Sequence, residues 1–154
     1  MDPYDKEKTR QIWKRVLGEE EPDDGCAMDS ERLRAMIADE KTDACIYRIL
    51  ARGARCGGEI LRRMSREEHC HAKRLEAVYF LWTGEKAQAV SNSLPKYACM
   101  AEALRDRHQH EVAGARMYRR TAEELPEFRE LFLELAADEA CHGEHILRLL
   151  QDYV

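Results

Sequence analysis

Apolar residues recur at spacings of three and four along most of this chain, which is the pattern of amphipathic helices. Four long stretches of this kind follow one another from residue 30 to the end, and a shorter one covers residues 5–17. Breaks rich in Gly, Pro or acidic residues separate them at residues 18–29, 53–58, 84–95 and 125–126. The pattern therefore predicts an all-α protein, with a four-helix bundle over residues 30–154 and a short helix and acidic linker over residues 1–29.

Each of the four apolar stripes contains residues that a core does not normally accept. Glu40 lies in the middle of the first stripe, where a buried carboxylate is costly unless it is neutralised, paired or bound to a metal. The candidate catalytic and metal-binding residues found in this way are Glu40, Glu68, His71, Glu111, Glu139 and His142.

These six residues follow an internal repeat of 71 residues. The motif E-x-x-H at Glu68 to His71 recurs at Glu139 to His142, and no other Glu has a His three residues later. The same shift superimposes Glu40 on Glu111, so each half carries a Glu that is followed 28 residues later by E-x-x-H. Such a repeat indicates two copies of a helical pair.

The spacing also indicates a metal centre. Residues three apart share a helix face, so Glu68 and His71 can reach one point. Four Glu and two His in this layout match the dinuclear carboxylate centres of four-helix bundles. Carboxylate and imidazole together suit iron or manganese more than zinc. The alternative is a metal-free bundle whose Glu and His residues pair with Arg; the duplicated motif favours the metal centre.

Convergence of four Glu at mid-bundle requires the second and third helices to be parallel, so their connection must travel the length of the bundle. Helices that ended at Gly84 and began at Pro95 would leave ~48 Å to span, whereas eleven steps of chain reach only ~37 Å. We therefore expect that at least one of these helices ends early, or that the loop takes residues from both.

Composition and charge narrow the class of protein. The chain has 154 residues, enough for one domain, and a net charge of −5 with the two signs interspersed. This pattern argues against nucleic-acid binding and membrane attachment, and no apolar run could span a bilayer. The start of the chain lacks signal-peptide character, and the six Cys never form C-x-x-C. We expect a cytoplasmic protein with reduced thiols and no rubredoxin-like or zinc-ribbon module.

Four segments resemble the rubrerythrin branch of the ferritin-like superfamily. They are residues 38–47, 68–75, 111–118 and 138–142, and the likeness extends over about residues 30–152. The resemblance implies a ferritin-like four-helix bundle with a long crossover after its second helix and two iron ions, with manganese as the alternative metal. The implied ligands are Glu40, Glu68, His71, Glu111, Glu139 and His142, in which the Glu of each E-x-x-H bridges the metals or chelates one and each His binds one iron.

The sequence departs from that family in two respects. Rubrerythrins usually carry a further Glu three residues after the ligand of the third helix, where this chain has Gly114, and a rubredoxin domain, which is absent here. Asp43 and His108 lie on the ligand faces and are candidates to compensate; the simpler interpretation is that they are polar residues around the ligands. The six-ligand set is also similar to that of di-iron hydroxylases and of ferritin-like domains attached to iron transporters.

The resemblance implies an oxidoreductase that reduces hydrogen peroxide, or oxidises Fe(II) with peroxide or dioxygen, at a buried dinuclear site. An external electron donor such as a rubredoxin-like protein would re-reduce the site. The alternatives are a di-iron oxygenase or hydroxylase acting on an organic substrate, and a non-catalytic module for iron binding or delivery. An apolar channel to the metals would favour the oxygenase, and a docking surface without a solvent path would favour the module.

The sequence also predicts the positions of residues beside the motifs. Glu67 and Asp138 either orient an imidazole across the bundle or are surface acids. Tyr47 and Tyr118 are expected in the core with satisfied hydroxyl groups, and the alternative is a radical or proton-transfer role.

The cysteines within the motifs, Cys70 and Cys141, are expected to be packing residues that point away from the ligands. The remaining histidines, His69, His110 and His145, are expected at the surface.

The predicted helix at residues 5–17 has an apolar face without an obvious partner in a four-helix bundle. The face consists of Ile12, Trp13, Val16 and Leu17. We expect this helix to pack across a dimer contact or over a flank of the bundle, and the protein to be a homodimer.

Overall fold

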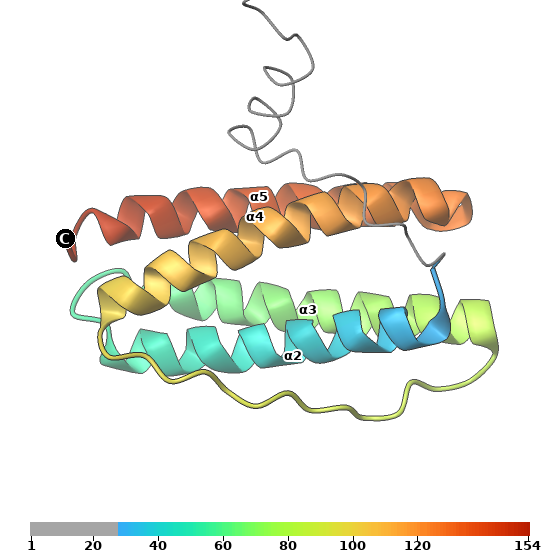
Figure 1. The fold of residues 1–154 in the computed structure, drawn as a ribbon, viewed down its shortest axis with the longest axis horizontal. Coiled ribbons are helices and arrows are strands. Elements are labelled where there is room, and N and C mark those ends of the chain that lie inside the picture. The colour runs from blue at the N-terminus through green and yellow to red at the C-terminus, as the bar shows by residue number, and fades with distance from the viewer. Residues whose placement is uncertain (1–27) are drawn as a thin grey trace, which may run out of the picture.

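The computed structural model describes residues 28–154, which contain four long helices. They are α2 (Ser30–Gly53), α3 (Gly58–Thr83), α4 (Met100–Glu124) and α5 (Arg129–Leu150), with a short 3₁₀ helix, η1 (Pro126–Phe128), before α5 (Figure 1). No strand occurs among the described residues. The predicted all-α four-helix bundle is confirmed for this part of the chain, whereas the helix predicted at residues 5–17 lies outside the described residues.

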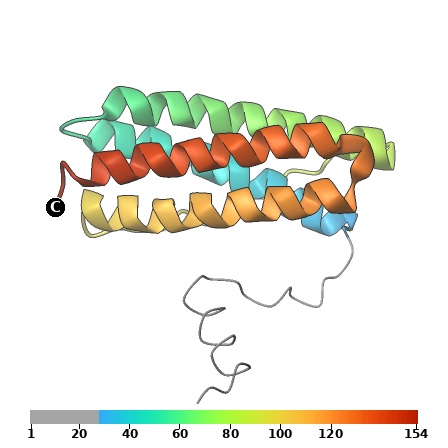
Figure 2. The same cartoon turned by 90° about the horizontal axis from the view of Figure 1, so that it is seen from above.

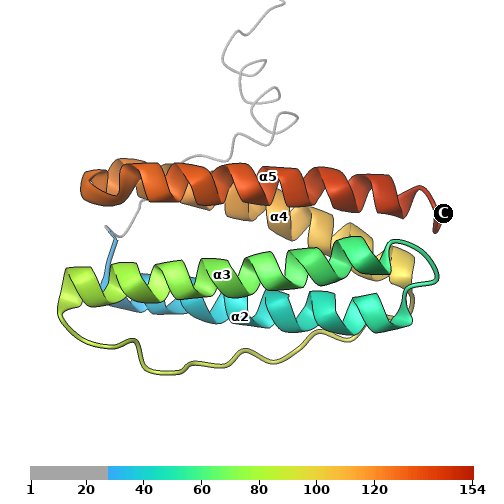
Figure 3. The ribbon, with the colours of Figure 1, turned by 180° about the vertical axis from the view of Figure 1, so that it is seen from behind.

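The helices form two antiparallel hairpins, which correspond to the two halves of the repeat. α2 packs along α3, and α4 packs along α5; Figures 2 and 3 show the two pairs lying face to face. α3 and α4 run in the same direction, because the connection over residues 84–99 returns along the length of the bundle (Figure 1). No helix in the part of the chain described combines the length and apolar character needed to cross a membrane.

The third helix begins later than the sequence suggested. α4 starts at Met100 rather than in the turn that contains Pro95. Since α3 continues to Thr83 at the far end of the bundle, the connection needs residues 95–99 to return to the start of α4. The conflict between loop length and bundle length is therefore resolved by shortening the third helix alone.

Side chains fasten this long connection to the bundle. Tyr97 Oη donates a hydrogen bond to Asp106 Oδ2 of α4 (2.6 Å). Asn92 Nδ2 donates to Asp39 Oδ1 of α2 (2.7 Å). The connection is thus attached to one helix of each hairpin.

The ends of the first hairpin follow the expected local chemistry. Asp29 caps α2, because its Oδ1 accepts a hydrogen bond from the backbone N–H of Arg32 (2.7 Å). The turn into α3 contains Gly57 with φ at +71°, and a Cβ there would lie 2.1 Å from Leu149 Cδ2. Only a glycine suits both the left-handed conformation and this close approach.

Apolar side chains gather in two clusters, one toward each end of the bundle. The first cluster includes Leu33, Leu75, Tyr118, Phe132 and Leu135. The second includes Tyr47, Leu61, Leu104, Ile146 and Leu149. Between the two clusters, every helix buries a Glu. We call this middle layer the polar belt; apolar packing closes it from water on both sides.

The first cluster allows a direct test of the packing. Replacing the fully buried Leu135 by Ala should reduce the free energy of unfolding by ~2–5 kcal/mol, because it leaves a cavity between helices. Leu133, two residues earlier on α5, is 39 % exposed, so Leu133→Ala should have a much smaller effect. Urea unfolding followed by circular dichroism measures both; equal losses would contradict this assignment of the core.

Candidate metal centre

The polar belt contains all six candidate residues from the sequence. Each is at most 5 % exposed. Their ligand atoms form two groups, and the atoms within each group lie within 4.8 Å of one another. The first group is Glu40, Glu68, His71 and Glu139, and the second is Glu68, Glu111, Glu139 and His142.

Two carboxylates, Glu68 and Glu139, belong to both groups. Each group is completed by one Glu and one His, and the 71-residue shift maps one group onto the other. The pair shared between the groups is the pair that precedes the two histidines in the E-x-x-H motifs. The arrangement therefore has two neighbouring centres with two carboxylates in common.

The charge of the belt requires cations or protons. One oxygen of each carboxylate is buried without a hydrogen-bond partner among the described residues: Glu40 Oε2, Glu68 Oε1, Glu111 Oε2 and Glu139 Oε1. A buried carboxylate oxygen without a partner is strongly unfavourable. These four oxygens, divided between two groups that share Glu68 and Glu139, fit a pair of divalent cations. The four positive charges would balance the four negative charges of the carboxylates.

The imidazole of His71 is held with one nitrogen facing the carboxylates. Its Nε2 lies 3.1 Å from Asp138 Oδ2, whereas its Nδ1 lies 2.9 Å from Glu68 Oε2 and 3.2 Å from Glu139 Oε1. A neutral imidazole that donates from Nε2 directs the lone pair of Nδ1 at these carboxylates. That arrangement is repulsive without a cation and suits a metal bound at Nδ1.

His142 repeats this arrangement from the other half. Its Nε2 lies 2.9 Å from Glu67 Oε2, and its Nδ1 lies 2.8 Å from Glu68 Oε1. The second pair is close but lacks hydrogen-bond geometry, since both atoms count among the buried atoms without partners. Of the two interpretations of Glu67 and Asp138, the structure supports the one in which each orients an imidazole across the bundle.

Without metal, the belt retains protons. Burial by itself lowers the pKa of His142, but the close approach of the Glu111 and Glu68 carboxylates raises it to about 12. Burial also opposes the charge of His71, yet contacts with Glu139, Glu40 and Glu68 raise its pKa well above 6.5. Burial, followed by the negative charge of Glu68, raises the pKa of Glu139. These protons stand where cations would otherwise neutralise the carboxylates.

Two tyrosines support the belt from the opposite hairpin. Tyr47 Oη of α2 donates to Glu111 Oε1 of α4, and Tyr118 Oη of α4 donates to Glu40 Oε1 of α2. Burial, and then the charges of these Glu residues, raise the pKa of both phenols well above 10. The hydroxyl groups therefore remain protonated donors, and the expectation of core tyrosines with satisfied hydroxyls is confirmed.

Asp43 is buried next to the belt but belongs to neither group. Its Oδ1 accepts from Arg107 Nη1 (2.6 Å) and its Oδ2 lies 3.0 Å from His110 Nε2. His108, the other candidate for an additional ligand, is also outside both groups and only half-buried.

The sequence did not indicate which residues of α4 neutralise Asp43. Arg107 is buried beside it, and His110, expected at the surface, is a half-buried partner of Asp43. His108 is a half-buried polar residue, as in the simpler interpretation. The hydrogen bond and charge of Asp43 raise the pKa of His110. A buried acid at position 43 requires a cation, and that requirement was the available signal for Arg107.

Position 114 is the repeat counterpart of Asp43, and its lack of a side chain matters. A Cβ added at Gly114 would lie 2.9 Å from Glu139 Oε2. Gly114 therefore leaves room for one of the two shared carboxylates, in the place where the resembling family has a further Glu.

The motif cysteines point away from the ligands, as expected, but the expectation that they are packing residues was wrong. Cys70 and Cys141 are exposed. On a helix whose neighbouring positions E and H face inward at i and i+3, position i+2 turns toward the outer face.

A hollow of about 260 Å³ opens at the edge of the belt. Its lining includes His71 and Asp138 together with Arg63, Arg66 and Arg74. The imidazole of one centre therefore lies at the base of a solvent-facing depression with cationic side chains around it.

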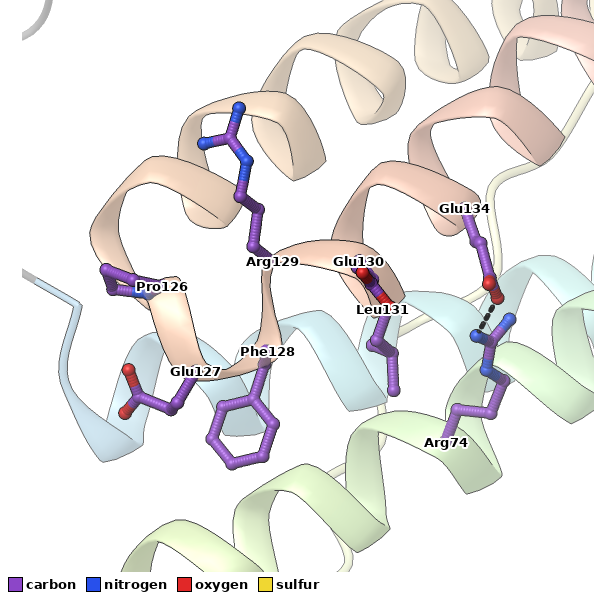
Figure 4. A pocket seen from close by; sticks show the side chains of 8 residues that line it. All are labelled: Arg74, Pro126, Glu127, Phe128, Arg129, Glu130, Leu131 and Glu134. Atoms are coloured by element: carbon purple, nitrogen blue, oxygen red, sulfur yellow. Dashed lines mark hydrogen bonds and ion pairs between the residues drawn. The ribbon is translucent and has the colours of Figure 1, made fainter.

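Another hollow, of about 570 Å³, lies at the turn between α4 and α5. Figure 4 shows Phe128 and Leu131 there, and the ion pair between Arg74 of α3 and Glu134 of α5 beside them. None of the six candidate residues lines it, so it has no part in the centre.

Comparisons with protein-family models, with curated proteins and with solved structures each return no match for this chain. The geometry and charge of the belt alone therefore indicate a metal centre.

Gly114 provides a test of that geometry. Gly114→Ala should weaken divalent-metal binding, because the new Cβ displaces the Glu139 carboxylate. The metal-free protein should be at least as stable as before, since Ala favours helix by ~0.5–1 kcal/mol relative to Gly. Titration with Mn(II), followed by electron paramagnetic resonance of the free ion, measures the affinity. Gly53→Ala is the control, because nothing lies within 4 Å of a Cβ there; equal affinities of the two variants would contradict the role of Gly114.

Proposed function

We propose that this chain is a non-haem di-iron, or iron–manganese, carboxylate protein of rubrerythrin type. The observation that carries the proposal is the pair of four-residue groups sharing Glu68 and Glu139, with an orphan oxygen on every buried Glu. In this proposal Glu40 and His71 would hold one metal and Glu111 and His142 the other, and Glu68 and Glu139 would be available to both.

We propose that the reaction is the reduction of hydrogen peroxide, or the oxidation of Fe(II) by peroxide or dioxygen. When bound, two Fe(II) ions supply the two electrons that, with two protons, convert one peroxide into two waters. The hollow lined by His71 and Asp138 opens to solvent, which supports the proposal that the oxidant is a small molecule. Tyr47 and Tyr118 hold their protons at Oη and keep one oxygen of Glu111 and of Glu40 engaged.

The partners belong to the same proposal. An external donor, such as a rubredoxin-like protein, would return the electrons, and a homodimer would cover the apolar face predicted at residues 5–17. Glu67 and Asp138 fix the imidazoles through Nε2, which would leave each Nδ1 available to bind a metal.

Metal analysis of anaerobically purified protein, followed by peroxide titration of the optical spectrum, tests this function. We expect two metal ions per chain and oxidation that is complete at one peroxide per two Fe(II). A metal-loaded protein that peroxide and dioxygen leave reduced would contradict the redox function and favour a module that stores or delivers iron.

Metal should also stabilise the folded protein, because it binds the folded state alone. At a thousandfold excess over the dissociation constant the gain is ~4 kcal/mol. Glu139→Ala should abolish this gain, and it should leave the metal-free protein as stable or more stable by relieving repulsion. Glu130→Ala, at an exposed position of the same helix, should keep the full gain. Anaerobic thermal denaturation with and without Fe(II) measures it; identical melting temperatures of the wild type in both conditions would refute the metal centre.

The pH dependence of stability should have opposite signs with and without metal. The raised pKa values of His71, His142 and Glu139 mean that the folded, metal-free protein holds protons that the unfolded chain releases. That stabilisation is complete below the ordinary values of 4.5 for Glu and 6.5 for His, and it is lost as pH rises toward about 12 for His142.

Metal must displace these protons, so the stability gained from Mn(II) should grow as pH rises and fade in acid. Urea unfolding at about pH 5, 7 and 9, in chelator and in excess Mn(II), measures both trends. A metal-free protein that gains stability over this range would show that the belt does not retain protons.

A further inference from the structure

A surface groove lies between α4 and α5 on the outer side of the belt. We call it the α4/α5 groove; it encloses about 340 Å³, within the range of small-molecule sites. Val112 of α4 and Leu147 of α5 are its large apolar residues and are 38 % and 49 % exposed, and His108 and Glu144 line it as well. Ala115 and Gly143, both buried, lie at its base.

The other hairpin provides an internal comparison, because the repeat places equivalent residues there. The counterparts of Val112 and Leu147, 71 residues earlier, are Lys41 and Glu76. Lys41 Nζ and Glu76 Oε1 form an ion pair of 2.6 Å, which joins α2 to α3. The same backbone arrangement is thus bridged by charges in one hairpin and left apolar in the other.

Two arginines and one acid supply the charge of the groove. Arg116 and Arg119 of α4 line it together with Glu144, whose carboxylate lies 3.5 Å from Arg148 Nη2. Arg119 lies seven residues beyond Val112, which is ~10 Å along the helix. A molecule that lies in the groove would therefore meet apolar side chains at one end and a guanidinium group at the other. This combination is complementary to an apolar chain with an anionic head.

The base of the groove adjoins the candidate metal centre. A Cβ at Gly143 would lie 3.6 Å from Glu111 Cβ, so one side chain separates the groove from the belt. A molecule bound in the groove would therefore lie close to Glu111, which is proposed to hold metal.

We propose that the α4/α5 groove binds a free, medium-length alkyl carboxylate, with its tail between Val112 and Leu147 and its carboxylate at Arg119. The chain's own apolar face at residues 5–17 is a poorer occupant on charge, since that segment carries five basic and two acidic residues and would meet arginines. The proposal goes beyond the redox function and does not depend on it.

Calorimetric titration of the full-length, metal-free protein with decanoate tests the proposal. We expect one saturable site per chain. Arg119→Gln should weaken it about tenfold, because a charge-assisted hydrogen bond is lost. Arg48→Gln, at the repeat counterpart of Arg119, should leave the affinity unchanged.

A double variant should close the groove, because it introduces into α4 and α5 the ion pair that joins α2 to α3. Val112→Lys with Leu147→Glu copies Lys41 and Glu76 and should abolish decanoate binding without altering the helical content. Decylammonium, which has the same tail and the opposite charge, should bind more weakly than decanoate.

Several results would overturn the proposal. These are the absence of saturable binding, equal affinity of the wild type and of Arg119→Gln, and a preference for decylammonium. Tighter decanoate binding by Trp13→Ala would identify the N-terminal segment as the occupant of the groove. A different molecular mass of the double variant, measured by light scattering, would identify a second copy of the chain. Tighter binding to phosphatidylglycerol vesicles than to decanoate would identify a lipid surface. Because decanoate binding is measured without metal, its failure is distinguishable from failure of the peroxide reaction.

Discussion

The mutual repulsion of four buried carboxylates is the constraint on which this structure depends. Glu40, Glu68, Glu111 and Glu139 come from four different helices and meet in a layer closed by apolar clusters. In such surroundings ionised carboxylates require cations or protons. The neighbouring polar groups are arranged accordingly. Two phenols donate hydrogen bonds to Glu111 and Glu40, and two imidazoles face the shared carboxylates.

The topology brings the four Glu together at mid-bundle, with α3 and α4 running in the same direction. The long connection over residues 84–99 follows from this, as does the late start of α4 at Met100. The belt itself adds no apolar burial, and the two apolar clusters must supply the stability that holds it together.

The departures from the internal repeat are as informative as the repeat itself. Asp43, neutralised by Arg107, has Gly114 as its counterpart, and the Lys41–Glu76 ion pair has the apolar pair Val112 and Leu147. The ligand geometry is thus nearly two-fold, whereas its surroundings are not. The two groups of candidate ligands therefore have different chemical surroundings, and the two hairpins present different surfaces to solvent.

The sequence alone determined the four helices, the parallel crossover and the six inward-facing residues, because helical periodicity and a 71-residue repeat are local and countable. It indicated, without deciding, that Glu67 and Asp138 contact imidazoles. It did not predict that Cys70 and Cys141 are exposed, or that Arg107 rather than its neighbour His108 is buried beside Asp43. One residue along a helix changes the direction of a side chain by ~100°, so neighbours such as these are separated only by the actual packing of the facing helix. The tertiary structure likewise decided which atoms meet. The partners of the tyrosine hydroxyls, the orphan oxygens and the approach of Gly114 to Glu139 depend on side chains from different helices. The spacing of residues within one helix does not determine the distances between helices.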